Sequence, residues 1–174
     1  MKEEAARAGI TFVYEDTFDA TTTDFTSRIA AAKKTSPDVY FIEGFEPGLG
    51  ILGQQLRDSG IQNMATIVAF SVSNKPELFE GGWYTDSYVS PEFKARLDQR
   101  YPSTRLATHM MPYAYDSFRI LVQGFESGQD ILTYVRGMTE YDGTAGKITK
   151  VAGTGNFRSS PAVWVIKNGK PAPR

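Results

Sequence analysis

Residues 36–46 read SPDVYFIEGFE, and this stretch decides the fold class. Ser36-Pro37-Asp38 ends a preceding helix, and the continuous apolar run at 39–42 is typical of a strand buried on both faces of a parallel sheet. Pro47 then stands as the first residue of a helix that ends at Gly60. A buried strand followed directly by a helix is the beginning of a βαβ unit.

The same alternation continues on both sides of this stretch. A strand rich in β-branched and aromatic residues is expected at 10–15, a helix at about 23–34, and another apolar strand at 65–70. The expected helix places three apolar residues on one face: Phe25, Ile29 and Ala32. Strands and helices at this spacing predict right-handed βαβ units and an α/β sheet.

The pattern changes after Gly81-Gly82. The expected elements are a strand at 83–84, a helix from Ser90-Pro91-Glu92 to about Arg100, helices at 112–125 and 130–138, a turn at Tyr141-Asp142-Gly143, a strand at 146–149, and a last strand at 161–170 that ends in the turn dipeptide Asn168-Gly169.

Composition narrows the class of protein. The 174 residues can form one domain or two small lobes, and 41% are hydrophobic and 22% charged, as in soluble globular proteins. Lys plus Arg (19) nearly balance Asp plus Glu (20), so no nucleic acid or anionic membrane surface is indicated as a partner. The absence of cysteine excludes disulfides and thiolate chemistry. No apolar stretch is long enough to span a bilayer.

Several short motifs occur in a fixed order along almost the whole chain. They are Thr23-Asp24-Phe25 with Ser36-Pro37-Asp38-Val39-Tyr40-Phe41; Gly44-Phe45-Glu46-Pro47 with Gly60-Ile61; Phe93 to Pro102 with Tyr113-Ala114-Tyr115-Asp116-Ser117; and Tyr141 to Ile148 with Gly155, Pro161 and Ile166 to Lys170. In this order they resemble the C-terminal portion of the leucine/isoleucine/valine-binding family, the branched-chain amino acid substrate-binding proteins of ABC transporters.

The resemblance implies a type I periplasmic binding protein fold, with two Rossmann-like α/β lobes joined by crossing strands and a ligand held between them. Residues 1–82 resemble a second-lobe segment, residues 83–160 a first-lobe segment, and residues 161–174 a return to the second lobe. The first part of the fold is expected to be missing, so we expect pairing with that N-terminal half or homo-oligomer formation through exposed apolar surface or an unpaired sheet edge.

The resemblance also implies a function and a location. It implies non-catalytic capture of a small polar, amino-acid-like or organic-acid ligand and its delivery to the membrane subunits of an ABC importer. It implies a periplasmic or extracellular protein, lipid-anchored or soluble, although residues 1–6 lack the pattern of a secretory signal. A ligand-sensing receptor domain on the same fold is the alternative.

Ligands of open α/β sheets bind beyond the carboxyl ends of the strands, which selects the segments after residues 42 and 70. In the amino-acid binders of the family an aromatic residue at the position of Phe45 packs on the ligand, and an acid near the position of Ser71 neutralises its ammonium group. Ser71 is not an acid, and a buried ammonium without a carboxylate is costly. Either Glu43 takes that role, or the ligand is a carboxylate, an aromatic acid or another small organic molecule.

Further candidates for ligand contact are Ser73, Trp83 and Tyr113. Ser71 and Ser73 offer hydroxyl groups after the second strand, Trp83 lies where a crossing strand is expected, and Tyr113 begins a helix near the same cleft. Each has a structural alternative, since Phe45 and the other aromatic residues can be packing residues and Glu43 a solvated or capping acid.

Other motifs predict no chemistry. Residues 48–53 spell G-x-G-x-x-G, which raises the alternative of a nucleotide-dependent α/β enzyme, but the glycines are expected inside a helix and no ribose-binding acid follows at 68–73. His109 is the only histidine and cannot build a typical zinc site. We therefore expect no catalytic residue, no metal and no cofactor.

Overall fold

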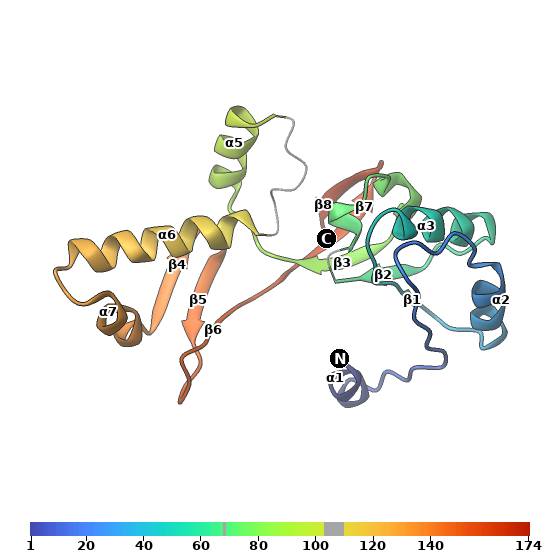
Figure 1. Cartoon of the computed structure of the whole chain (residues 1–174), viewed down its shortest axis with the longest axis horizontal. Coiled ribbons are helices and arrows are strands. Elements are labelled where there is room, and N and C mark those ends of the chain that lie inside the picture. Colours follow the sequence, from blue (N-terminus) through green and yellow to red (C-terminus); the bar gives the residue numbers. More distant parts are fainter. Residues whose placement is uncertain (68, 103–109) are drawn as a thin grey trace. The chain divides into compact units, whose positions relative to one another are not determined.

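The computed structural model describes residues 1–67, 69–102 and 110–174, and of Ser71 and Val72 it describes the backbone alone. The chain divides into two units: unit 1 contains Met1–Tyr84, Val165–Ala172 and Arg174, and unit 2 contains Thr85–Trp164 and Pro173. The chain passes from unit 1 to unit 2 within strand β3 (Trp83–Asp86) and returns within β7 (Ala162–Lys167) (Figure 1). The assignment of residues 1–82, 83–160 and 161–174 to the lobes of a larger fold stays a prediction.

A five-stranded sheet of order β1–β2–β3–β7–β8 is the framework of unit 1. It contains β1 (Tyr40–Phe41), β2 (Met64–Thr66) and β8 (Lys170–Pro173), together with the two strands that lead to and from unit 2. β1 pairs with β2 and β2 with β3, both in parallel, with Tyr40 opposite Met64 and Ala65 opposite Trp83. The predicted α/β class with a parallel sheet is therefore confirmed.

The helices of unit 1 are α1 (Lys2–Arg7), α2 (Thr26–Lys34), α3 (Gly48–Asp58), the short α4 (Ala69–Val72) and a 3-10 turn, η1 (Pro76–Phe79). The predicted apolar face of α2 is confirmed, because Phe25, which precedes it, and its Ile29 and Ala32 are buried. α3 buries Leu49, Leu52 and Leu56. Apolar residues at helical spacing thus supply part of the core of this unit.

Aromatic rings close the core beside the sheet. Phe70 stacks on Phe79 with ring centroids 4.3 Å apart and meets Tyr84 edge-on at 6.2 Å. All three rings are almost fully buried. These contacts fix α4 and η1 against β3.

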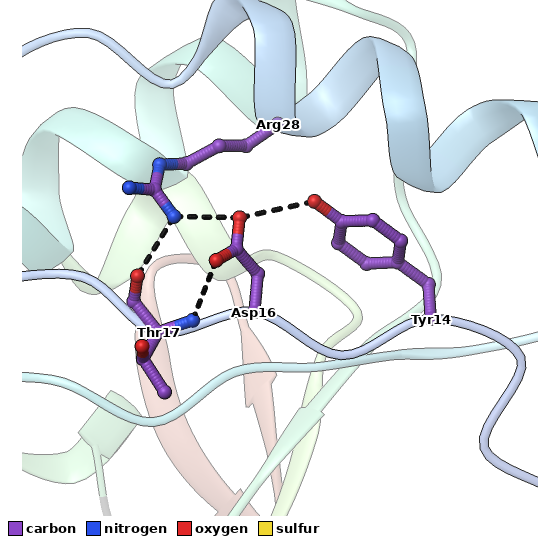
Figure 2. Close-up of polar contacts among 4 residues, drawn as sticks. All are labelled: Tyr14, Asp16, Thr17 and Arg28. Atoms are coloured by element: carbon purple, nitrogen blue, oxygen red, sulfur yellow. Dashed lines mark hydrogen bonds and ion pairs between the residues drawn. The ribbon is translucent and has the colours of Figure 1, made fainter.

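The predicted strand at 10–15 is wrong, because this segment is irregular. Ile10 and Val13 are 60% and 49% exposed, so their β-propensity has no neighbouring strand to act on. The end of this segment is instead fixed by an ion pair and hydrogen bonds of the following residue, Asp16. The Asp16 carboxylate pairs with Arg28 of α2 at 2.5 Å and accepts hydrogen bonds from the hydroxyl of Tyr14 at 3.0 Å and the amide of Thr17 at 2.8 Å (Figure 2).

Two other predicted strands are shorter than expected. The run 39–42 contributes only β1, and Phe41 is 43% exposed rather than buried on both faces, because β1 is the outermost strand of the described sheet. The run 65–70 ends as a strand at Thr66, and Ala69 and Phe70 belong to α4. A short apolar run does not distinguish a strand from a buried helix.

Unit 2 combines three helices with an antiparallel sheet. The helices are α5 (Pro91–Arg100), α6 (Met111–Glu126) and α7 (Ile131–Gly137), and the strands β4 (Glu140–Gly143), β5 (Gly146–Lys150) and β6 (Phe157–Ser159) pair in that order. In Figure 1, α6 runs across the ribbons of β4 and β5. The predicted start of α5 is confirmed, since the Ser90 hydroxyl accepts from the amide of Phe93 at 3.2 Å.

The predicted turn at Tyr141-Asp142-Gly143 is wrong by two residues. These residues lie in β4, where Gly143 pairs with Gly146, so Thr144 and Ala145 form the turn. The turn is displaced because the buried Asp116 carboxylate of α6 binds it, accepting from the amides of Thr144 at 2.8 Å and Ala145 at 2.7 Å. Strand β6 was not anticipated from the sequence.

Within the described residues, none of the helices has the length and apolar character that crossing a bilayer requires.

Candidate functional site

The carboxyl ends of β1 and β2 meet at Glu43. Glu43 follows β1 by two residues, and its Oε2 atom accepts hydrogen bonds from the Thr66 hydroxyl at 2.7 Å and from the amide of Ile67 at 3.3 Å. Thr66 is the last residue of β2 and is buried. Parallel pairing brings these two strand ends to the same edge of the sheet, where ligands of α/β proteins bind.

A second carboxylate, that of Glu46, joins the same two segments. Its Oε1 atom accepts from the Ser73 hydroxyl and the amide of Asn74, both at 3.0 Å. Its Oε2 atom accepts from the amide of Gly50, also at 3.0 Å, at the start of α3. Glu46 therefore holds the loop after β1, the first turn of α3 and the segment after α4 in one arrangement.

Phe45 lies between these two carboxylates in the chain. It is 77% exposed, although a phenyl ring of this size usually finds an apolar partner. The preceding Gly44 packs closely on Phe18, since a β-carbon at Gly44 would come within 2.9 Å of that ring. Packing of Gly44 on Phe18 thus fixes the loop, while the ring of Phe45 remains exposed and available to a ligand.

Glu43 and Ser73 are each joined by hydrogen bonds that involve the loop after β1, Glu43 to Thr66 and Ser73 to Glu46, and Phe45 belongs to that loop. Ser73 is buried and its hydroxyl is engaged with Glu46, so it supports the loop. Ser71 belongs to α4 by its backbone, but its side chain lies outside what the structure describes. We name the group formed by Glu43, Phe45, Glu46, Thr66 and Ser73 the strand-end cluster.

The strand-end cluster can recognise a small ligand by charge and by apolar contact. Both hydrogen bonds that Glu43 makes with described residues use Oε2, which leaves Oε1 open to a donor from a ligand. The exposed ring of Phe45, which belongs to the same loop two residues later, offers an apolar face. In the part of the chain that the structure describes, no three His, Asp or Glu side chains gather as metal ligands would.

Trp83 and Tyr113 have contacts of their own with residues outside the strand-end cluster. Trp83 is half-buried in β3, opposite Ala65, and the guanidinium of Arg174 lies over its ring at 5.8 Å. Tyr113 belongs to unit 2, in the first turn of α6, where its hydroxyl hydrogen-bonds that of Ser159 at 2.6 Å. Each therefore has a packing partner of its own, and ligand contact by either stays a prediction.

The glycines of the G-x-G-x-x-G motif all lie in α3, as predicted. They are packing positions, because a β-carbon would come within 2.8 Å of the Ala20 carbonyl at Gly48 and within 2.7 Å of the Phe79 ring at Gly53. A phosphate-binding motif would instead place them in the turn that precedes the helix. His109 lies in the segment 103–109, outside the described residues.

Sequence reasoning missed Glu46 and Thr66. The position of Glu46, directly before Pro47 and the helix, was a usable signal, because acidic side chains stabilise free amides at helix starts. Thr66 gave no such signal, since a single threonine in an apolar strand is ordinary.

A family model described as "Periplasmic binding protein" matches residues 1–170. No curated protein matches the sequence. Solved structures match over nearly the whole chain. One is a leucine-binding protein from Thermotoga maritima, with 22% identity and a TM-score of 0.71 over 90% of this chain and 49% of that one. Another is a solute-binding protein of an ABC transporter from Rhodopseudomonas palustris in complex with p-hydroxybenzoic acid, with 21% identity and a TM-score of 0.72 over 99% of this chain and 53% of that one.

An amino acid ABC transporter substrate-binding protein from Pseudomonas fluorescens is similar at 19% identity, with a TM-score of 0.73, over 95% of this chain and 49% of that one. At these identities the likeness shows the fold. The chain spans about half the length of the solved proteins that it matches.

Proposed function

We propose that this chain, which belongs to the periplasmic binding protein family, is part of a solute-binding component that captures a small ligand for an ABC importer. The observation that carries this proposal is the strand-end cluster, in which the free oxygen of Glu43 and the exposed ring of Phe45 stand at the carboxyl ends of two parallel strands. The likeness to solved solute-binding and substrate-binding proteins of ABC transporters supports the importer role.

The chemistry of the cluster favours a ligand with an ammonium or another hydrogen-bond donor attached to an apolar body. The Glu43 carboxylate would pair with the donor, and the Phe45 ring would cover the apolar part. This gives Glu43 the role that an acid near Ser71 has in the amino-acid binders. An organic acid is the competing ligand class, and one of the relatives was solved with p-hydroxybenzoic acid.

Thermal unfolding in the presence of ligands separates these classes. We expect small apolar amino acids to raise the melting temperature of this chain, because a ligand at about 100 times its Kd adds about 2.7 kcal/mol to the stability of the folded state. We expect Glu43→Gln to weaken an ammonium-bearing ligand about tenfold, and Phe45→Ala to weaken it by a similar factor, in a calorimetric titration.

Matched controls are Glu3→Gln and Phe12→Ala, which remove a carboxylate and a partly exposed ring from unit 1 outside the cluster. They should leave the affinity unchanged. Stabilisation by aromatic acids that Glu43→Gln strengthens would move the proposal to an organic-acid ligand. No saturable binding from either class would contradict the proposed function.

The remaining parts of this function are proposed on the same basis. Units 1 and 2 would contribute segments of the second and first lobes. Ligand contact is proposed for Ser71 and Trp83 of unit 1 and, separately, for Tyr113 of unit 2. Capture would proceed without chemical change of the ligand, in the periplasm or outside the cell, with the importer's membrane subunits as partners. Incubation of a bound ligand with the chain, followed by its recovery unaltered in mass, tests the absence of catalysis.

A further inference from the structure

Unit 2 contains a hollow between α5 and α6 that shares no residue with the strand-end cluster. Its volume is about 790 Å³, within the range of roughly 300–1,000 Å³ common for small-molecule sites. Phe93 and Leu97 of α5 line it as part of a small core cluster, and Met111 of α6 packs against them. The base of the hollow is therefore apolar and formed by packed side chains.

Aromatic and cationic groups border this apolar base. Tyr115 of α6 lies against Phe93, with ring centroids 5.2 Å apart and planes tilted by 49°. The guanidinium of Arg96 lies 5.6 Å above the Tyr115 ring, and that of Arg100 lies 5.9 Å above the ring of Tyr101. All of these residues line the hollow.

The two arginines carry charge that their described neighbours do not neutralise. Arg96 and Arg100 are four residues apart on α5, which places them on one side of the helix. Among the described residues neither takes part in an ion pair, whereas Lys94 on the same helix pairs with Asp98 at 2.7 Å. Two exposed guanidiniums beside an apolar, aromatic hollow complement a ligand that is flat, apolar and negatively charged at one end.

We propose that this hollow binds a small aromatic carboxylate. The ring would lie on Phe93 and Leu97 beside Tyr115, and the carboxylate would accept hydrogen bonds from Arg96 and Arg100, whose forked donors match its two oxygens. The site goes beyond the proposed function, because it lies within unit 2 alone and needs no part of the strand-end cluster.

Titration of the chain with phenylacetate tests the site. We expect saturable binding with amide chemical-shift changes centred on Leu97 and Tyr115. Phenylacetamide, which has nearly the same shape without the charge, should bind at least about tenfold more weakly. Affinity for phenylacetate should also fall as salt is added, because about 0.1 M salt screens exposed charges beyond about 10 Å.

Variants that remove the charge of Arg96 or Arg100 test whether these side chains contribute to the affinity for phenylacetate. Arg96→Gln and Arg100→Gln should each weaken phenylacetate about five- to tenfold, and the double variant should abolish measurable binding. The matched control is Arg136→Gln with Arg158→Gln, which removes the same charge from exposed positions of unit 2 and should leave the affinity unchanged. Glu43→Gln should leave it unchanged too, which separates this site from the proposed function.

Three outcomes would overturn the inference. Equal affinity for phenylacetate and phenylacetamide would remove the role of the arginines. If the Arg136→Gln/Arg158→Gln control lost as much affinity for phenylacetate as the double variant of Arg96 and Arg100, phenylacetate would be attracted only by the net charge of the chain. Chemical-shift changes that never saturate would show an adventitious additive only.

Discussion

Glu46 has the most connections of any side chain in the strand-end cluster. Its two oxygens accept three hydrogen bonds, from Ser73, Asn74 and Gly50, and so join segments 27 and 28 residues apart in the sequence. Among the described residues, the neighbouring Glu43 has two hydrogen-bond partners, both on Oε2. At the scale of single residues, one carboxylate supports the loop and the other remains available for a ligand.

Replacing Glu46 should therefore destabilise the fold. Glu46→Ala leaves the buried Ser73 hydroxyl and two amides without their acceptor, and we expect a loss of about 1–3 kcal/mol in the free energy of unfolding by urea. Glu46→Gln, which keeps one acceptor oxygen, should cost less. Glu77→Ala, at an exposed site in the same unit, is the control. A Glu46→Ala protein as stable as this control would contradict the supporting role.

Asp16 gives a prediction about pH. Hydrogen bonds from Arg28, from the Thr17 amide and from Tyr14 lower the pKa of the Asp16 carboxyl below its ordinary value of 3.8. Because the pKa is lower in the folded chain than in the unfolded one, these bonds stabilise the folded state above the unfolded pKa. That stabilisation disappears as the pH falls through the folded pKa.

Urea unfolding of Asp16→Asn at two pH values tests this. We expect the variant to be less stable than the parent chain at about pH 6, and the difference to vanish as the pH falls through the folded pKa of Asp16. Asp19→Asn, at an exposed position nearby, is the control. A difference that is constant with pH would show that the ionised form of Asp16 contributes nothing.

At the scale of elements, α6 is held to the β4–β5 hairpin by one buried side chain. Asp116 accepts from the amides of Thr144 and Ala145 and from the Thr144 hydroxyl at 2.9 Å. A β-carbon at Gly143 would come within 2.4 Å of the Asp116 carboxylate, so the hairpin approaches the helix as closely as the backbone allows.

Loss of this anchor should release the hairpin. We expect Asp116→Ala to cost about 2–4 kcal/mol in the free energy of unfolding, because the buried amide of Ala145 and the partly buried amide of Thr144 lose their acceptor. Hydrogen exchange at the amides of Thr144 and Ala145 should accelerate by the corresponding factor. Asp142→Ala, an exposed position in β4, should leave both rates unchanged. Unchanged protection in Asp116→Ala would place the anchor elsewhere.

Helices were predicted better from the sequence than strands. The starts of α5 and α7 follow from side-chain caps at Ser90 and Asp130, and the buried stripe of α2 follows from its period. The strands at 10–15 and 65–70 were misjudged because a strand exists only where a neighbour pairs with it, and that neighbour is set by the fold.

The residues of the candidate site also differ in how far their positions could be expected from the sequence. The position of Glu43 after β1 could be expected, because the end of a buried strand can be read from its apolar run. Ser73 was expected directly after a strand at 65–70, whereas it follows α4, and ligand contact by either residue stays a prediction. Glu46 was not predicted, since its three partners lie up to 28 residues away and only the folded chain brings them within reach.

At the scale of the whole molecule, large apolar side chains remain exposed in both units. In unit 2 they lie on α6 and α7, where Phe118 is 63%, Phe125 78% and Leu132 55% exposed. In unit 1 the unpaired segment at 10–15 exposes Ile10 and Val13. Surfaces of this kind usually mark contacts with another polypeptide.

We therefore expect the chain alone to associate. Light scattering should give a mass above that of one chain, 19.3 kDa, and the mass should fall with dilution. Phe118→Ser combined with Phe125→Ser should shift the population towards the monomer, because it removes two exposed rings without touching the core. The double variant Lys33→Ser and Lys34→Ser, on exposed positions of α2, is the control. A single monomeric species at high concentration would contradict this expectation.

Chemical-shift mapping with the amino acid that most raises the melting temperature tests the central claim most directly. If the strand-end cluster binds the ligand, we expect the largest amide shifts at residues 43–46, 66–67 and 73–74, and we expect Glu43→Gln to abolish them. Shifts confined to other parts of the chain, or unaffected by Glu43→Gln, would contradict the assignment of ligand capture to the strand-end cluster.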